Sequence, residues 1–121
     1  MKPYVMVPFD CPVPGLDIVD QPRAGLVGAF LSNADGEEES YLADIASVQA
    51  GAAPIERGDG FVDAVFYPEG HVIITDTFYS KDYEANKGPG YSVQITLVEA
   101  KQLILDWLQV KQQYWQSRER T

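Results

Sequence analysis

The sequence contains very little cysteine and histidine. Among 121 residues there is one Cys, Cys11, and one His, His71. A lone cysteine excludes an internal disulfide, and one Cys with one His cannot complete a tetrahedral zinc site without carboxylates. A catalytic Cys–His pair would need these two distant residues to meet, and nothing in the sequence indicates that they do. The chain fits a reducing compartment, and we expect His71 to be a partly exposed surface residue.

Phosphate-binding and calcium-binding motifs are also missing. Neither GxGxxG nor GxxxxGK[ST] occurs in the chain. The stretch SNADGEEES has Asn33, Asp35 and Gly36 at calcium-loop offsets. A loop in that register would begin at Leu31 and end at Leu42, where carboxylates are required. We therefore expect no cofactor and no bound metal.

Long hydrophobic runs are absent as well. No segment approaches the roughly 20 apolar residues that span a bilayer. The first 15 residues, MKPYVMVPFDCPVPG, contain four prolines and no apolar run of signal-peptide length. We expect a soluble, cytoplasmic protein.

Basic residues are scarce, so the charge is strongly negative. The chain has 9 Lys and Arg against 18 Asp and Glu, a net charge of -9. Residues 3–100 hold 16 of the acids and four of the bases, a balance of -12. Such a surface repels nucleic acid and anionic lipid and speeds encounter with a cationic protein. Acidity also serves solubility in proteins with no cationic partner.

Apolar residues are plentiful enough for one folded domain. They make up 45% of the chain and include seven Tyr, five Phe and two Trp. That content can offset the entropy of ordering a chain of this length. We predict a single domain over residues 1–121, with residues 116–121 as a frayed tail.

Hydrophobic spacing predicts several strands. The first is Pro3–Phe9, at a sheet edge where prolines are tolerated, followed by a proline-rich loop over residues 10–23. The apolar run Ala24–Ser32 predicts a buried strand. Residues 60–67 (GFVDAVFY) and 71–78 (HVIITDTF), separated by Pro-Glu-Gly, predict a hairpin.

A first helix is expected between these strands. The turn Asn33–Gly36 leads into three glutamates, which favour a helix N-terminus. Leu42, Ile45 and Ala46 supply its apolar stripe, and Gly51 with the following proline ends it.

The last helix has the clearest signals. After a loop over residues 79–90 and a strand over residues 91–95, Thr96 and Glu99 form a capping box. One face then continues with Lys111 as its only polar break: Ala100, Leu103, Ile104, Trp107, Leu108, Lys111, Tyr114 and Trp115. The fold class we predict is α+β, a mostly antiparallel sheet of four or five strands with two helices and the last helix packed on the sheet.

Two acidic segments with tyrosines are the candidate partner-binding surface. Carboxylates steer and pair with Lys or Arg, while Tyr gives contact area at low entropic cost. The segments lie at the first helix start and after the hairpin, and their candidate residues are Asp35, Glu37, Glu38, Glu39, Tyr41, Asp44, Asp76, Tyr79, Asp82, Tyr83 and Glu84. The glutamates alone also suit an ordinary solvated helix start.

An enzymatic alternative rests on two carboxylates. Asp63 and Asp76 lie on the two hairpin strands among apolar residues, and opposed strands would bring them together as a glycosidase-like pair. We favour the reading in which both face solvent or a partner, so catalysis is not expected.

The organisation of residues 24–115 resembles that of a known class of proteins. An acidic helix after a turn, a hairpin, and a strand running into a capped helix (VQITLVEAKQLILDWLQ) are similar to the immunity proteins that protect bacteria from contact-dependent growth inhibition and other polymorphic toxins. The resemblance implies a protein that neutralises a basic toxin domain, a nuclease, by occluding its active site or a nearby surface. It carries no binding residue over by position. The other hypotheses are the carboxylate enzyme and an adaptor or subunit with an exposed apolar patch, and the oligomeric state stays open.

Overall fold

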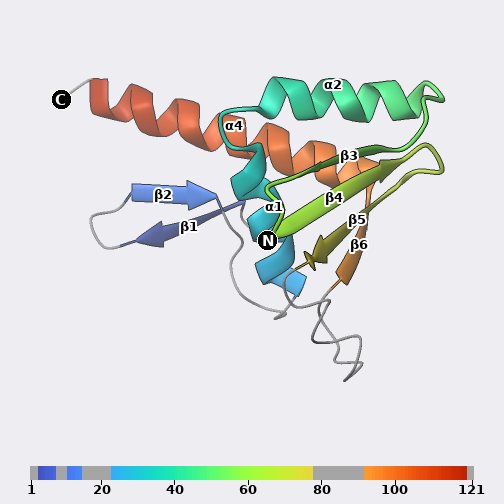
Figure 1. The fold of residues 1–121 in the computed structure, drawn as a ribbon. Coiled ribbons are helices and arrows are strands. Elements are labelled where there is room, and N and C mark those ends of the chain that lie inside the picture. The colour runs from blue at the N-terminus through green and yellow to red at the C-terminus, as the bar shows by residue number, and fades with distance from the viewer. Residues whose placement is uncertain (1–2, 8–10, 15–22, 78–91, 120–121) are drawn as a thin grey trace.

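The computed structural model of the chain describes residues 3–7, 11–14, 23–77 and 92–119. These residues form an α+β fold with a four-stranded antiparallel sheet, a separate two-stranded pair and three helices (Figure 1). The elements in chain order are β1 (Tyr4–Val7), β2 (Cys11–Pro14), α1 (Arg23–Ala34), α2 (Glu38–Gln49), β3 (Ile55–Gly58), β4 (Val62–Tyr67), β5 (His71–Asp76), β6 (Ser92–Thr96) and α4 (Leu97–Glu119). The predicted fold class is confirmed.

The large sheet has the order β3-β4-β5-β6, with every neighbouring pair antiparallel. Alternate residues of β4 and β5 are buried, and the register pairs Ala64 with Ile74 and Phe66 with Val72. The helices pack against this inner face, so the core lies between one side of the sheet and the helical layer.

The helices form a layer over the sheet in which α2 and α4 lie side by side (Figure 1). At its centre, the ring of Phe30 on α1 lies 5.8 Å from Tyr41 on α2 and 6.1 Å from Phe66 on β4. The C-terminal half of α4 continues past the sheet toward the β1–β2 pair and contacts β2. This arrangement brings the start of α2 against the middle of α4.

The predicted strand Ala24–Ser32 is wrong, because this segment belongs to helix α1. A continuous apolar run suits a buried helix as well as a buried strand, since neither needs a polar face. In α1 the buried side chains recur at helical spacing: Leu26, Val27, Phe30, Leu31 and Ala34. The described residues therefore contain three helices where two were expected.

The predicted loop over residues 10–23 is also corrected, because Cys11–Pro14 forms β2 and pairs with β1. Pro12 and Pro14 are two residues apart, so their missing N–H groups fall on the same edge of the strand and leave the other edge to pair with β1. The short strand β3 was not predicted at all. The expected loop over residues 79–90 lies outside the described residues.

The hairpin, the last strand and both predicted helices are confirmed. However, the buried face of α2 is not the one that the apolar stripe predicted. Ala46 is exposed, and the buried positions are Glu38, Tyr41, Ile45 and Val48. The capping box of α4 forms as predicted, since Glu99 N donates to Thr96 Oγ1 (3.0 Å) and Thr96 N donates to Glu99 Oε1 (3.1 Å).

Candidate protein-binding surface at the start of α2

The acidic residues at the start of α2 divide into two groups. Asp35, Glu38 and Asp44 are held by cations of this same chain. Glu37 and Glu39 are exposed and lie outside those ion pairs. Of these five acids, only Glu37 and Glu39 are therefore fully available to a partner.

Lys111 on α4 holds the first two carboxylates. Its Nζ donates hydrogen bonds to Asp35 Oδ1 (2.8 Å) and to Glu38 Oε2. Trp107 Nε1 also donates to Asp35 Oδ1 (3.0 Å), and Gly36 N donates to Glu38 Oε1 (3.0 Å). Glu38 is only 5% exposed, so its carboxylate is a structural link between α2 and α4.

These contacts shift the pKa values of both partners. Burial raises the pKa of Asp35, but hydrogen bonds from Lys111 and Trp107 outweigh it and leave the pKa below its usual 3.8. Burial lowers the pKa of Lys111, but its bonds to Asp35 and Glu38 outweigh that and leave the pKa above 10.5. The charges of Asp35 and Lys111 are therefore both present near neutral pH.

A second cation fixes the other side of α2. The guanidinium of Arg57 on β3 donates to Asp44 Oδ2 and to Ser40 Oγ, and it lies 5.4 Å above the ring of Tyr41. Its hydrogen bond to Asp44 raises the pKa of Arg57. Tyr41 itself is 2% exposed, so this predicted contact residue lies in the core and not on the surface.

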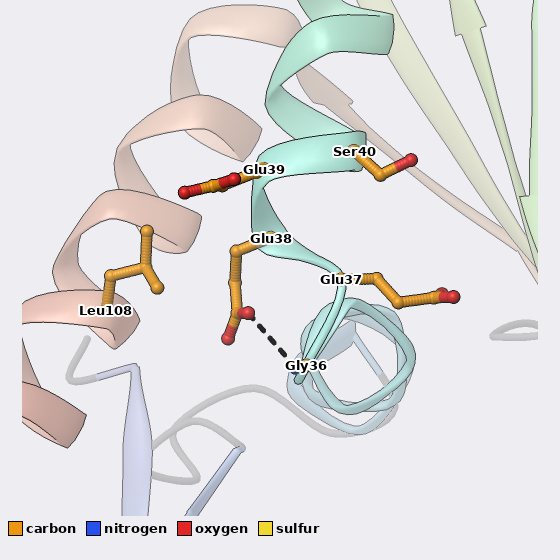
Figure 2. Close-up of a pocket in the computed structure, with 6 residues that line it drawn as sticks. All are labelled: Gly36, Glu37, Glu38, Glu39, Ser40 and Leu108. Atoms are coloured by element: carbon orange, nitrogen blue, oxygen red, sulfur yellow. Dashed lines mark hydrogen bonds between the residues drawn. The ribbon is translucent and has the colours of Figure 1, made fainter.

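The two exposed glutamates border a shallow hollow of about 460 Å³. It is lined by Gly36, Glu37, Glu38, Glu39, Ser40 and Leu108. Figure 2 shows Glu39 directed toward α4 and Glu37 toward the opposite side of α2, with Glu38 between them bound to Gly36. Leu108 adds an apolar wall from α4, so the hollow combines negative charge with a patch of apolar surface.

The second predicted acidic segment is described only at its first residue. Asp76 is the last residue of β5 and pairs with Val62. Tyr79, Asp82, Tyr83 and Glu84 lie outside the described residues.

The two carboxylates of the enzymatic alternative do not meet. Asp63 pairs with Thr75, whereas Asp76 pairs with Val62, so the two aspartates point to opposite faces of the hairpin. Asp63 Oδ1 instead accepts a hydrogen bond from Gly60 N (3.2 Å). A glycosidase-like pair of these two residues is excluded by the register.

His71 is half-buried and stacks on Tyr67, with the ring centroids 4.8 Å apart. Within the described residues, no group of three or more His, Cys, Asp or Glu side chains is arranged to hold a metal ion. Over the same part of the chain, no helix has the length and apolar character needed to cross a membrane.

Sequence reasoning missed the internal partners of the acids. Lys111 did stand out as the only polar break in the apolar face of the last helix, and a lysine on a buried face requires a carboxylate. Arg57 gave no such signal, because β3 was not recognised.

Comparison with known proteins finds no relative of this chain: no family model, no curated protein and no solved structure matches it.

Proposed function

We propose that this chain is an immunity protein that binds a cationic toxin domain in the cytoplasm and neutralises it. The observation that carries the proposal is the pair Glu37 and Glu39, both exposed and both lining a hollow whose framework is fixed by internal ion pairs. Carboxylates held at a rigid helix start are suited to Lys and Arg side chains of a partner.

The charge balance of the surface supports a cationic partner. Three Lys or Arg side chains are described in full, namely Arg57, Lys101 and Lys111. Arg57 and Lys111 are bound to acids of this chain, which leaves Lys101 as the exposed cation of that set. With a net charge of -9, the protein attracts basic surfaces and repels phosphate backbones.

A nuclease domain fits this chemistry best. Its substrate-binding surface is built to receive phosphates, and the carboxylates of Glu37 and Glu39 would stand in for them while Leu108 covers apolar surface beside the site. Binding there, or on an adjoining surface, keeps the nucleic acid out. The protein needs no catalytic group of its own for this role.

Genome context and co-expression test the proposal. The neighbouring open reading frame should encode a large secreted protein with a basic C-terminal domain that is toxic when expressed alone in the cytoplasm. Co-expression of this chain should restore growth, and the two purified proteins should form a complex that weakens as salt rises. A domain that stays toxic in the presence of this chain contradicts the proposal.

A further inference from the structure

Helix α4 carries an exposed apolar seam in addition to the face it buries. Within the described residues, five large hydrophobic side chains are exposed, and three of them lie on α4: Val98 (70%), Leu105 (40%) and Trp115 (61%). Val98 and Leu105 are seven residues apart, and the half-buried Leu108 stands seven residues before Trp115. These positions belong to one heptad pattern, the signature of a helix that packs against another helix.

The seam is displaced by one residue from the buried face. The inward positions are Leu97, Ala100, Ile104, Trp107, Lys111 and Tyr114, and the seam positions are Val98, Lys101, Leu105, Leu108, Gln112 and Trp115. One residue corresponds to about 100° around an α-helix, so the seam lies beside the core-facing side and toward solvent. Exposed apolar side chains in such a row mark an interaction site.

The seam has the same pattern when it is read in either direction. Its order is apolar, polar, apolar, apolar, polar, apolar, from Val98 to Trp115. If two copies pack antiparallel about a two-fold axis, Val98 meets Trp115 of the other copy, Leu105 meets Leu108, and Lys101 meets Gln112. Every layer then matches like with like, which is the property of an isologous interface.

The residues of α4 that flank the seam on its solvent side carry no charge that would repel a second copy. The flanking row of α4 on the solvent side of the seam consists of Gln102, Gln109 and Gln116, all neutral. Two chains that each carry a net charge of -9 repel one another in general, and this row of α4 adds no acid to the contact. Glu39 of α2, which lines a hollow together with Leu108, is the acid beside the seam, so the dimer should be stronger at high salt. The polar layers of Lys101 and Gln112 would fix the register, as single polar residues do in coiled coils.

Trp115 is the largest side chain of the seam and is 61% exposed. Its ring packs edge-on against Tyr114, with the centroids 5.4 Å apart, and it borders a hollow with Pro12, Val13 and Pro14 of β2. A tryptophan side chain has only two rotatable χ angles, so it offers a large contact area at a small entropic cost on binding. The seam spans about 26 Å of helix, and one helix pair of that length buries on the order of 1,000 Å², near the lower limit for a specific interface.

We propose that the protein forms an antiparallel dimer through the α4 seam. This inference does not depend on the proposed toxin-binding function, since it uses neither Glu37 nor Glu39. Leu108 belongs both to the seam and to the hollow at α2, so a second copy and a partner at the hollow would compete for this side chain.

Sedimentation velocity across a concentration series tests the dimer. The wild-type chain should show a concentration-dependent monomer–dimer equilibrium. Leu105→Glu should raise the dimer dissociation constant about 100-fold or more, because two seam layers then carry a buried charge. Gln113→Glu adds the same charge on the far side of α4 and should leave the constant unchanged. A wild-type chain that is monomeric at every concentration, or a dimer insensitive to Leu105→Glu, overturns the proposal.

Disulfide cross-linking tests the antiparallel direction. In a Cys11→Ser background, Val98→Cys mixed with Trp115→Cys should form a cross-linked heterodimer under mild oxidation, while Val98→Cys alone should not. Efficient cross-linking of Val98→Cys to itself would show parallel pairing and contradict the proposal. Circular dichroism of each variant at low concentration verifies that the fold is retained.

Discussion

Lys111 on α4 is bound to Glu38, a carboxylate that is 5% exposed and lies 73 residues earlier in the chain. Because the same amine also binds Asp35, one lysine joins the α1–α2 turn and the first residue of α2 to the last helix. The acids that seemed available for a partner are thus partly used within the fold. Glu37 and Glu39 remain on the surface, held in position by this link.

Replacing Lys111 by Met should destabilise the fold. Glu38 would keep a buried charge without its cation, and loss of one partner of a buried ion pair costs about 3–5 kcal/mol. Since Lys111 is 26% exposed, water compensates in part, and we expect a loss of about 1–3 kcal/mol in the free energy of unfolding. Urea denaturation measures this loss.

The matched control is Lys101→Met, the same change at an exposed position of the same helix. At concentrations where the chain is monomeric, it should alter the free energy of unfolding by less than about 0.5 kcal/mol. The double variant Glu38→Gln/Lys111→Met should be more stable than the sum of the single losses predicts, because the two residues are coupled. Simple additivity would show that the Lys111–Glu38 contact contributes nothing.

Stability should depend on pH through the same cluster. The pKa of Asp35 in the folded protein lies below 3.8, so its contribution is complete above pH 3.8 and is lost as the pH falls through the folded value. The pKa of Lys111 lies above 10.5, so its contribution is complete below pH 10.5 and is lost as the pH rises through the folded value. The stability difference between wild type and Lys111→Met should therefore form a plateau between these limits and decline outside them. A difference that stays constant at both extremes of pH contradicts this assignment.

Phe30→Ala should be among the most damaging core substitutions. Phe30 is 1% exposed and lies between Tyr41 and Phe66, so the change removes ring contacts with α2 and β4 together. Deleting a buried phenylalanine ring costs about 3–5 kcal/mol. Ser32→Ala, an exposed position on the same helix, serves as the control and should be close to neutral. A loss below about 1 kcal/mol for Phe30→Ala would argue against a buried α1, since it falls short of the core range.

The capping box should contribute to the stability of α4. Thr96→Ala removes the acceptor for Glu99 N at the helix start and should cost about 1 kcal/mol. Thr96→Ser keeps the hydroxyl and should retain most of that stability. Thermal or urea unfolding distinguishes the two variants, and equal losses in both would show that the hydroxyl has no capping role.

The parts of the fold that the sequence predicts correctly are those with local chemical signals. Thr96 and Glu99 mark the start of α4, and Gly70, with φ of 114°, occupies a turn position that suits glycine. Segment 24–32 has a single polar side chain, Ser32 at its end, so the sequence does not reveal its period and its helical state depends on what it packs against. Pro12 and Pro14 concealed β2, because prolines signal a loop unless their spacing is matched to a strand edge.

The candidate surface was predicted only in part, because a sequence does not show which charges are already paired. Glu37, Glu38 and Glu39 are adjacent and chemically alike. Glu38 nevertheless accepts a hydrogen bond from Lys111 of α4, whereas its two neighbours face solvent. That difference follows from the orientation of α2 about its own axis, which buries Glu38 and Tyr41 on one side of the helix. This orientation is set by packing against Phe30 and Phe66, which lie in separate elements of the chain.

The most direct measurement of the central claim is the affinity of a double variant, Glu37→Gln/Glu39→Gln, for the cationic domain encoded beside this chain. Its matched control is Glu56→Gln/Glu69→Gln, which removes the same charge from exposed positions on β3 and the β4–β5 turn. Surface plasmon resonance should show the dissociation constant rising about 100-fold for the first variant, because two charge-assisted hydrogen bonds are lost, and changing little for the control. Equal effects of the two variants, or no effect of either, would contradict a docking site at the start of α2.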